Sequence, residues 1–69
     1  MPSTAIRHVS YDSAKAELIV TFVTGRRYLY ANVPPEIFTA FGEAPSKGAY
    51  FNALIRDAFA YRELERERR

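Results

Sequence analysis

The sequence predicts an α+β domain, in which a three-stranded antiparallel meander is followed by a short and a long helix packed on one face (β-β-β-α-α). Apolar residues in the segment 18–30 alternate with the period of two that is typical of strands, on both sides of Gly25. Pro34 and Pro35 end this pattern because proline cannot donate a ladder hydrogen bond. Apolar residues then recur at helical spacing over residues 51–59. These observations favour strands first and helices afterwards.

The length and composition of the chain limit its organisation. Its 69 residues have room for one small domain with one core. We expect residues 1–4 to be a disordered lead, residues 5–62 to form the domain and residues 63–69 to form a charged helical tail. The lack of cysteine and the single histidine argue against disulfides and against metal sites built from these residues.

The hydropathy pattern gives no sign of a membrane protein. No apolar run approaches the roughly 18 residues of a membrane span, and the start lacks the apolar region of a signal peptide. The net charge of +2 is weaker than that of most dedicated nucleic-acid binders. We therefore expect a cytoplasmic protein with no cofactor, no metal and no membrane partner.

The first strand is expected over residues 5–11, at an edge of the sheet, because each of its faces mixes apolar and polar side chains. One face would hold Ile6, His8 and Ser10, and the other Arg7, Val9 and Tyr11. Residues 12–16 are polar, and Asp12 and Ser13 can hydrogen-bond to their own backbone, which predicts a turn into the second strand. We interpret Tyr11 and Asp12 as part of that turn.

A hairpin with a three-residue loop is expected around Gly25. A two-residue loop of Thr24 and Gly25 would need a positive φ at a β-branched threonine, or glycine in the first position. In the longer loop, Val23 and Thr24 form a type I turn and Gly25 takes the left-handed position without steric cost.

The odd length of this loop decides which side chains share a face. It pairs Val20 with Tyr28 and Leu18 with Tyr30. We expect the core face to hold Leu18, Val20, Phe22, Tyr28 and Tyr30, and the other face to hold Ile19, Thr21, Arg27 and Leu29.

Two helices are expected after the hairpin. Pro35 suits the first turn of the short helix, and Gly42 is expected to end it. Ser46 is the expected N-cap of the long helix, with Gly48 allowing close backbone approach in its first turn. The stripe that should cover the sheet consists of Phe51, Leu54, Ile55, Ala58 and Phe59. We expect this helix to fray beyond Tyr61.

Several short motifs follow one another in a specific order and spacing. They are Tyr11-Asp12, Leu18, Val20 and Phe22 before Gly25, Tyr28-Leu29-Tyr30, Val33-Pro34, the connector 44–48, and Tyr50-Phe51-Asn52 leading to Ile55-Arg56. Over residues 6–61 this pattern resembles the KTSC domain family, a small domain at the C-terminus of some lysyl-tRNA synthetases and also a free-standing bacterial protein. The resemblance implies a bacterial protein, and the attachment to a synthetase suggests RNA binding.

Tyr28 and Tyr30 are the first candidate site residues. Two aromatic side chains on one sheet face could stack nucleic-acid bases. The register around Gly25 also places them beside Val20 and Leu18 in the core. We favour the core interpretation, with the hydroxyl groups reaching the rim, and keep stacking as the alternative.

The second candidate site combines basic residues with a helix start. Arg26 and Arg27 at the hairpin tip, and Ser46, Lys47 and Gly48 at the helix N-terminus, could hold phosphates. For each of them alone, a solubilising charge or a helix cap is slightly favoured, but together the hairpin tip and the helix start are the best prediction of a binding site.

Residues on the long helix and the remaining polar side chains complete the candidates. Asn52 and Arg56 lie four positions apart and could read a base edge, although a structural hydrogen bond is the favoured role. His8 has no partner for catalysis in the sequence and is expected to be structural.

The leading functional hypothesis is a non-enzymatic nucleic-acid-binding module, with RNA or tRNA as the partner. No nucleophile and base occur at a recognisable spacing, so no catalytic residue is expected. The alternative is a protein-protein or self-association module that uses an open strand edge or an uncovered sheet face with Val9, Ile19 and Leu29.

Overall fold

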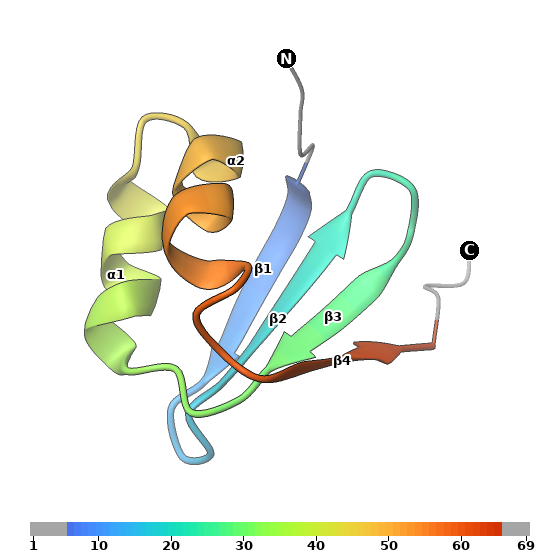
Figure 1. The fold of residues 1–69 in the computed structure, drawn as a ribbon, viewed down its shortest axis with the longest axis horizontal. Coiled ribbons are helices and arrows are strands. Elements are labelled where there is room, and N and C mark those ends of the chain that lie inside the picture. Colours follow the sequence, from blue (N-terminus) through green and yellow to red (C-terminus); the bar gives the residue numbers. More distant parts are fainter. Residues whose placement is uncertain (1–5, 66–69) are drawn as a thin grey trace.

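The protein folds as a four-stranded antiparallel sheet with its helical segments on one side (Figure 1). The computed structural model describes residues 6–65. Its elements are β1 (Ile6–Asp12), β2 (Glu17–Phe22), β3 (Arg27–Tyr30), α1 (Pro35–Glu43), α2 (Lys47–Tyr50), the π-helical η1 (Phe51–Ile55) and β4 (Tyr61–Leu64). The strands lie in the order β1-β2-β3-β4. The predicted α+β class is confirmed, but the sheet has one strand more than predicted.

The hairpin between β2 and β3 has the predicted three-residue loop. The Gly25 N–H donates to the Phe22 carbonyl at 2.8 Å, which closes a four-residue turn. Gly25 itself has a φ of 94°, in the region that only glycine adopts without strain. The predicted pairs also form, with Leu18 opposite Tyr30 and Val20 opposite Tyr28. Local turn chemistry therefore sets the register of the central strands.

The fourth strand replaces the predicted helical continuation. The helical segment ends at Ile55, and β4 then pairs antiparallel with β3, placing Tyr61 opposite Tyr30 and Glu63 opposite Tyr28. The expected helix through Tyr61 and the helical tail from Glu63 are wrong at this point. A charge-rich sequence favours a helix locally, but pairing with the open edge of β3 satisfies that strand's backbone groups and prevails. Residues 1–4 and 66–69 lie outside the described residues.

The core lies between the sheet and the helical segments. Its buried members are Leu18, Val20, Tyr30, Val33, Phe41, Phe51 and Ile55. Val9 packs against this core because it pairs with Val20, so its predicted place on an uncovered face is wrong. A β-bulge between Ile6 and His8 shifts the register of β1, and Ile6 therefore packs on the same side as Val9.

Tyr11 was predicted only as part of a turn, but its side chain also makes long-range contacts. Its hydroxyl donates to the Val33 carbonyl across the sheet edge. Its ring stacks on Phe38 of α1, with centroids 5.1 Å apart. Asp12 does form the expected turn, because its Oδ1 accepts from the Ala14 N–H at 3.0 Å. Tyr11 thereby joins β1 to α1 and to the segment that precedes it.

The second helical segment is shorter than its apolar pattern predicts. Ser46 caps it as expected, its hydroxyl accepting from the Ala49 N–H at 3.2 Å. In η1 the Arg56 N–H bonds to the Phe51 carbonyl five residues earlier, which widens the turn. Leu54 is 48% exposed, although it belongs to the predicted stripe. Ala58 is exposed too, because it lies beyond the helix end.

The first helix starts where expected but continues past its predicted end. Pro35 occupies its first turn, next to the acidic Glu36. Gly42 lies inside the helix, which ends at Glu43, so the predicted stop at Gly42 is wrong. Ala44 leaves the helix in an extended conformation, which needs no glycine. Within residues 6–65, no helix is both long and apolar enough to cross a bilayer.

Candidate nucleic-acid interface

A groove of about 550 Å³ lies between the hairpin tip, the end of η1 and strand β4. These three segments come from distant parts of the sequence and meet on the helix-covered side of the sheet. The groove is lined by Phe22, Thr24, Arg26, Tyr28, Tyr30, Phe51, Asn52, Arg56, Asp57 and Tyr61.

Aromatic rings form a closed circuit along this groove. Going round, the neighbouring centroids are 5.7 Å apart for Phe22–Tyr28, 5.7 Å for Tyr28–Tyr61, 5.4 Å for Tyr61–Tyr30, 5.6 Å for Tyr30–Phe51 and 5.5 Å for Phe51–Phe22. We call these five residues the aromatic floor. Tyr30 and Phe51 are almost completely buried, whereas Tyr61 is 59% exposed. Tyr61 is thus the ring of the floor that presents the most surface to a ligand.

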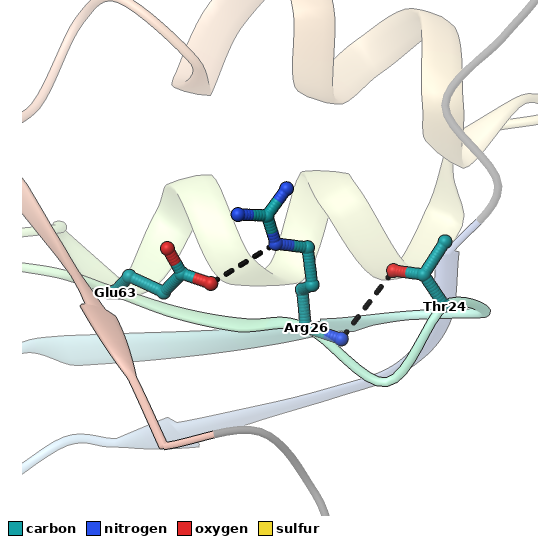
Figure 2. A network of polar contacts seen from close by, with 3 residues as sticks. All are labelled: Thr24, Arg26 and Glu63. Carbon is teal, nitrogen blue, oxygen red and sulfur yellow. Dashed lines mark hydrogen bonds and ion pairs between the residues drawn. The ribbon is translucent and has the colours of Figure 1, made fainter.

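Arg26 lies at one rim of the groove and is held by strand β4. Its Nε donates to Glu63 Oε2 at 3.0 Å, and both side chains are about half exposed. Figure 2 shows the two side chains meeting on the helix side of the sheet. The Arg26 backbone N–H donates to the Thr24 hydroxyl at 3.4 Å, within the hairpin tip. The hydrogen bond and the negative charge of Glu63 raise the pKa of Arg26, so the guanidinium remains charged.

Tyr30 lies at the bottom of the groove as a neutral phenol. Burial, with smaller contributions from the neighbouring Tyr61 and Tyr28, raises its pKa to about 12, while Arg56 acts in the opposite direction. Arg56 and Asp57 also line the groove, so one positive and one negative charge lie near Tyr30. The groove therefore combines neutral aromatic surface with two arginines and one aspartate at its rims.

The structure brings together five of the nine residues predicted as site residues. Arg26, Tyr28, Tyr30, Asn52 and Arg56 all line the groove. Tyr30 belongs to the core and Tyr28 packs against it, so the favoured core interpretation is confirmed, while both rings also form the floor. Core packing and a contribution to the groove are therefore compatible for these two tyrosines.

The other four predicted site residues lie elsewhere. Arg27 is on the opposite sheet face from Tyr28, because successive strand residues alternate. Its guanidinium donates to the Glu65 carbonyl at 3.5 Å. Lys47 Nζ donates to the Gly42 carbonyl at 3.2 Å, and Ser46 caps the helix. Ser46, Lys47 and Gly48 do not line the groove.

The sequence did not reveal the contribution of β4 to the groove. Tyr61 completes the aromatic floor and Glu63 pairs with Arg26. A period of two is present in residues 61–64, with Tyr61 and Glu63 on one face and Arg62 and Leu64 on the other. That alternation could have predicted a strand, but the charged residues around it favoured a helix.

The chain belongs to the KTSC domain family, whose model matches residues 2–59. A crystal structure of a KTSC domain protein from Yersinia pestis superimposes with a TM-score of 0.85 and 28% identity, covering 94% of each chain. A protein of Tsukamurella paurometabola is 39% identical over 57 residues, which are 83% of this chain and 85% of that protein.

The family also occurs as a part of a larger enzyme. A lysine–tRNA ligase of Nostoc punctiforme is 34% identical over 61 residues, which cover 88% of this chain but 11% of the ligase. The chain thus spans about a tenth of that relative. Strand β4, at residues 61–64, lies beyond the end of the family match and supplies part of the groove.

Proposed function

We propose that this protein is a non-enzymatic module that binds RNA, including tRNA, through the groove lined by the aromatic floor. The observation that carries the proposal is the arrangement of five aromatic rings between two arginines in one groove. Aromatic rings stack on bases of any sequence, and arginines contact phosphates. We further propose that it acts in the bacterial cytoplasm, as its similarity to lysine–tRNA ligases suggests.

The chemical character of the groove supports binding rather than catalysis. Its described lining holds hydroxyl groups, one amide and one carboxylate, but no histidine and no cysteine. Such a set can donate and accept hydrogen bonds along a base edge, with Asn52 as the side chain best suited to that task. The relatives named as lysine–tRNA ligases add support for an RNA ligand, since each contains this domain as a small part.

The proposal places the site on the groove and no longer on the helix start. Arg26, Tyr28, Tyr30, Asn52 and Arg56 remain in it, and Tyr61 is added. The proposed site omits Arg27, on the opposite sheet face, and also Ser46, Lys47 and Gly48, which lie outside the groove.

Titration with tRNA and with single-stranded RNA at low salt tests the proposal. We expect micromolar binding that weakens as salt rises, because each phosphate contact releases counterions and contributes a slope of about −0.7 for single strands. Arg56→Ala should weaken binding and make the salt dependence shallower. Lys15→Ala is the matched control, because it removes one exposed positive charge in the turn between β1 and β2, away from the groove. Absence of binding to either RNA at low salt would overturn the proposal.

A second candidate function is self-association through the uncovered sheet face. This face carries Ile19 and Leu29, and a small apolar hollow of about 170 Å³ lies beside Leu29 at the end of β3. Leu29 itself is buried, so the apolar surface that this face offers to a partner is the hollow together with the half-buried Ile19, and apolar surface can mark a protein interface. Sedimentation across a concentration series tests it: a dimer at high concentration would support self-association, and a monomer throughout would argue against it.

A further inference from the structure

The exposed ring of Tyr61 is the feature of the groove that best indicates its ligand. Its ring lies 5.7 Å from that of Tyr28 and 5.4 Å from that of Tyr30, so neighbours support it on one side. More than half of the residue nevertheless remains exposed. A ring that is held in place by its strand and open to the groove can accept a second planar ring with little loss of side-chain freedom.

The shape of the groove favours an unpaired base over a duplex. Bases inside a helix are already stacked on each other, so their faces are not available to a protein ring. The volume of about 550 Å³ falls within the range of roughly 300–1,000 Å³ that is typical of sites for single small ligands. The groove therefore suits one nucleotide that has left the stack.

Glu63 occupies a position that a phosphate could take. Its carboxylate contacts Arg26 Nε at 3.0 Å, and carboxylate and phosphate oxygens accept the same donors of a guanidinium. The pair is exposed to solvent, so water and ions already weaken it and an incoming phosphate can replace it. Glu63 lies two residues after Tyr61 in β4, on the same sheet face, so a nucleotide on Tyr61 has its phosphate near Arg26.

We propose that the groove binds one unpaired nucleotide, whose base stacks on Tyr61 and whose phosphate replaces Glu63 on Arg26. The inference rests on the RNA-binding function proposed above and names the form of RNA that the groove accepts. In the free protein, Glu63 neutralises Arg26 and thereby lowers the affinity for any nucleic acid that does not also supply a stacked base.

Fluorescence anisotropy with a short single-stranded RNA, and with the same strand annealed to its complement, tests the base contact. We expect the single strand to bind more tightly than the duplex. Tyr61→Ala should weaken single-strand binding by about fivefold to a hundredfold, the range for loss of one stacked base. Tyr61→Phe should retain it, because the ring remains. Leu54→Ala is the control, since it removes another half-exposed apolar side chain outside the groove.

The phosphate contact is tested with Glu63→Gln. Removal of the competing charge should raise the affinity for single-stranded RNA by about twofold to fivefold, as expected for loss of one exposed ion pair. Glu43→Gln makes the same charge change at the end of α1, outside the groove, and should have a smaller effect because salt screens distant charges.

The outcomes separate this inference from the proposed function. Failure of both the single strand and the duplex to bind overturns the proposed function together with this inference. Binding that favours the duplex, or that is unchanged in Tyr61→Ala, overturns the inference alone and leaves RNA binding in place. Thermal melting shows whether the Tyr61→Ala variant is folded. If that variant is unfolded, the Glu63→Gln variant decides: an affinity for single-stranded RNA that is unchanged or lower than that of the wild type overturns the inference.

Discussion

Three tyrosines on the helix-covered face of the sheet differ in how much of each side chain is exposed. Tyr30 lies on β3, inside the sheet and beneath η1, and is almost completely buried. Tyr61 is directly opposite it on the edge strand β4 and is mostly exposed. Tyr28 is partly buried and contacts the Tyr61 ring. The same residue type therefore supplies core packing at one position and an exposed aromatic ring at the next.

The first prediction concerns the ionisation of Tyr30. Burial raises its pKa to about 12 in the folded chain, above the value of about 10 in the unfolded chain. The unfolded chain therefore loses this proton first, and the stabilisation is present below pH 10 and lost as the pH rises towards 12. We expect a decrease on the order of 2 kcal/mol in the free energy of unfolding over this interval. Urea unfolding between pH 8 and pH 11.5 measures the slope.

Tyr30→Phe is the comparison for this measurement. The phenylalanine cannot ionise, so its stability should depend less steeply on alkaline pH than that of the wild type. Equal slopes for the two proteins would show that another group governs the alkaline behaviour.

The second prediction concerns Tyr11. Its hydroxyl donates to the Val33 carbonyl, while its ring stacks on Phe38. Tyr11→Phe keeps the ring and removes the donor, and should lower the free energy of unfolding by about 1–2 kcal/mol. Chemical denaturation measures the change. Tyr61→Phe is the control, since the Tyr61 side chain is mostly exposed, and equal losses in the two variants would contradict the structural role given to Tyr11.

At the scale of elements, glycine has different roles in the hairpin and in α1. Gly25 has a positive φ that the three-residue loop requires. Gly42 is an ordinary helical residue, and a Cβ added there would meet no atom within 4 Å. Replacement of glycine by alanine should therefore lower the stability of the fold at position 25 and raise it at position 42.

The third prediction compares Gly25→Ala with Gly42→Ala. The first should destabilise the protein by about 1–3 kcal/mol, because alanine is strained at a positive φ. The second should stabilise it by about 0.5–1 kcal/mol, because alanine has the higher helix propensity. Thermal or urea unfolding of both variants measures the two changes in stability. A neutral effect at Gly25 would mean that the loop can adopt another conformation.

At the scale of the whole molecule, the groove depends on the assembled fold. Its lining comes from the β2–β3 hairpin, from η1 and the residues after it, and from β4. These segments meet only when the sheet is complete and the helical segments are packed on it (Figure 1). A ligand in the groove therefore binds the folded state and not the unfolded chain.

The fourth prediction follows from this dependence. Single-stranded RNA at 100 times its Kd should stabilise the fold by about 2.7 kcal/mol. For a domain of this size that corresponds to a rise in Tm of about 10–20 °C. Scanning fluorimetry with and without RNA measures the shift, and Tyr61→Ala at the same RNA concentration should show a smaller one. A wild-type Tm that does not move under saturating RNA would contradict binding to the native groove.

Short-range features of this protein follow from its sequence alone. The Gly25 loop, the Ser46 cap and the position of Pro35 were all predicted correctly. Each depends on the chemistry of a few consecutive residues, such as a required φ or one local hydrogen bond. The hairpin register follows from the loop length, and so the side-by-side position of Tyr28 and Tyr30 was also predicted.

The tertiary structure alone decided the fourth strand and the groove. Tyr61 meets Tyr30 across 31 positions of sequence, and a charged segment with helical character becomes a strand because the open edge of β3 offers it backbone partners. The side chain of Arg26, which lines the groove, pairs with Glu63, a contact across 37 positions. Residue type indicated which side chains could form the site, but long-range pairing determined which of them meet and how exposed each one is.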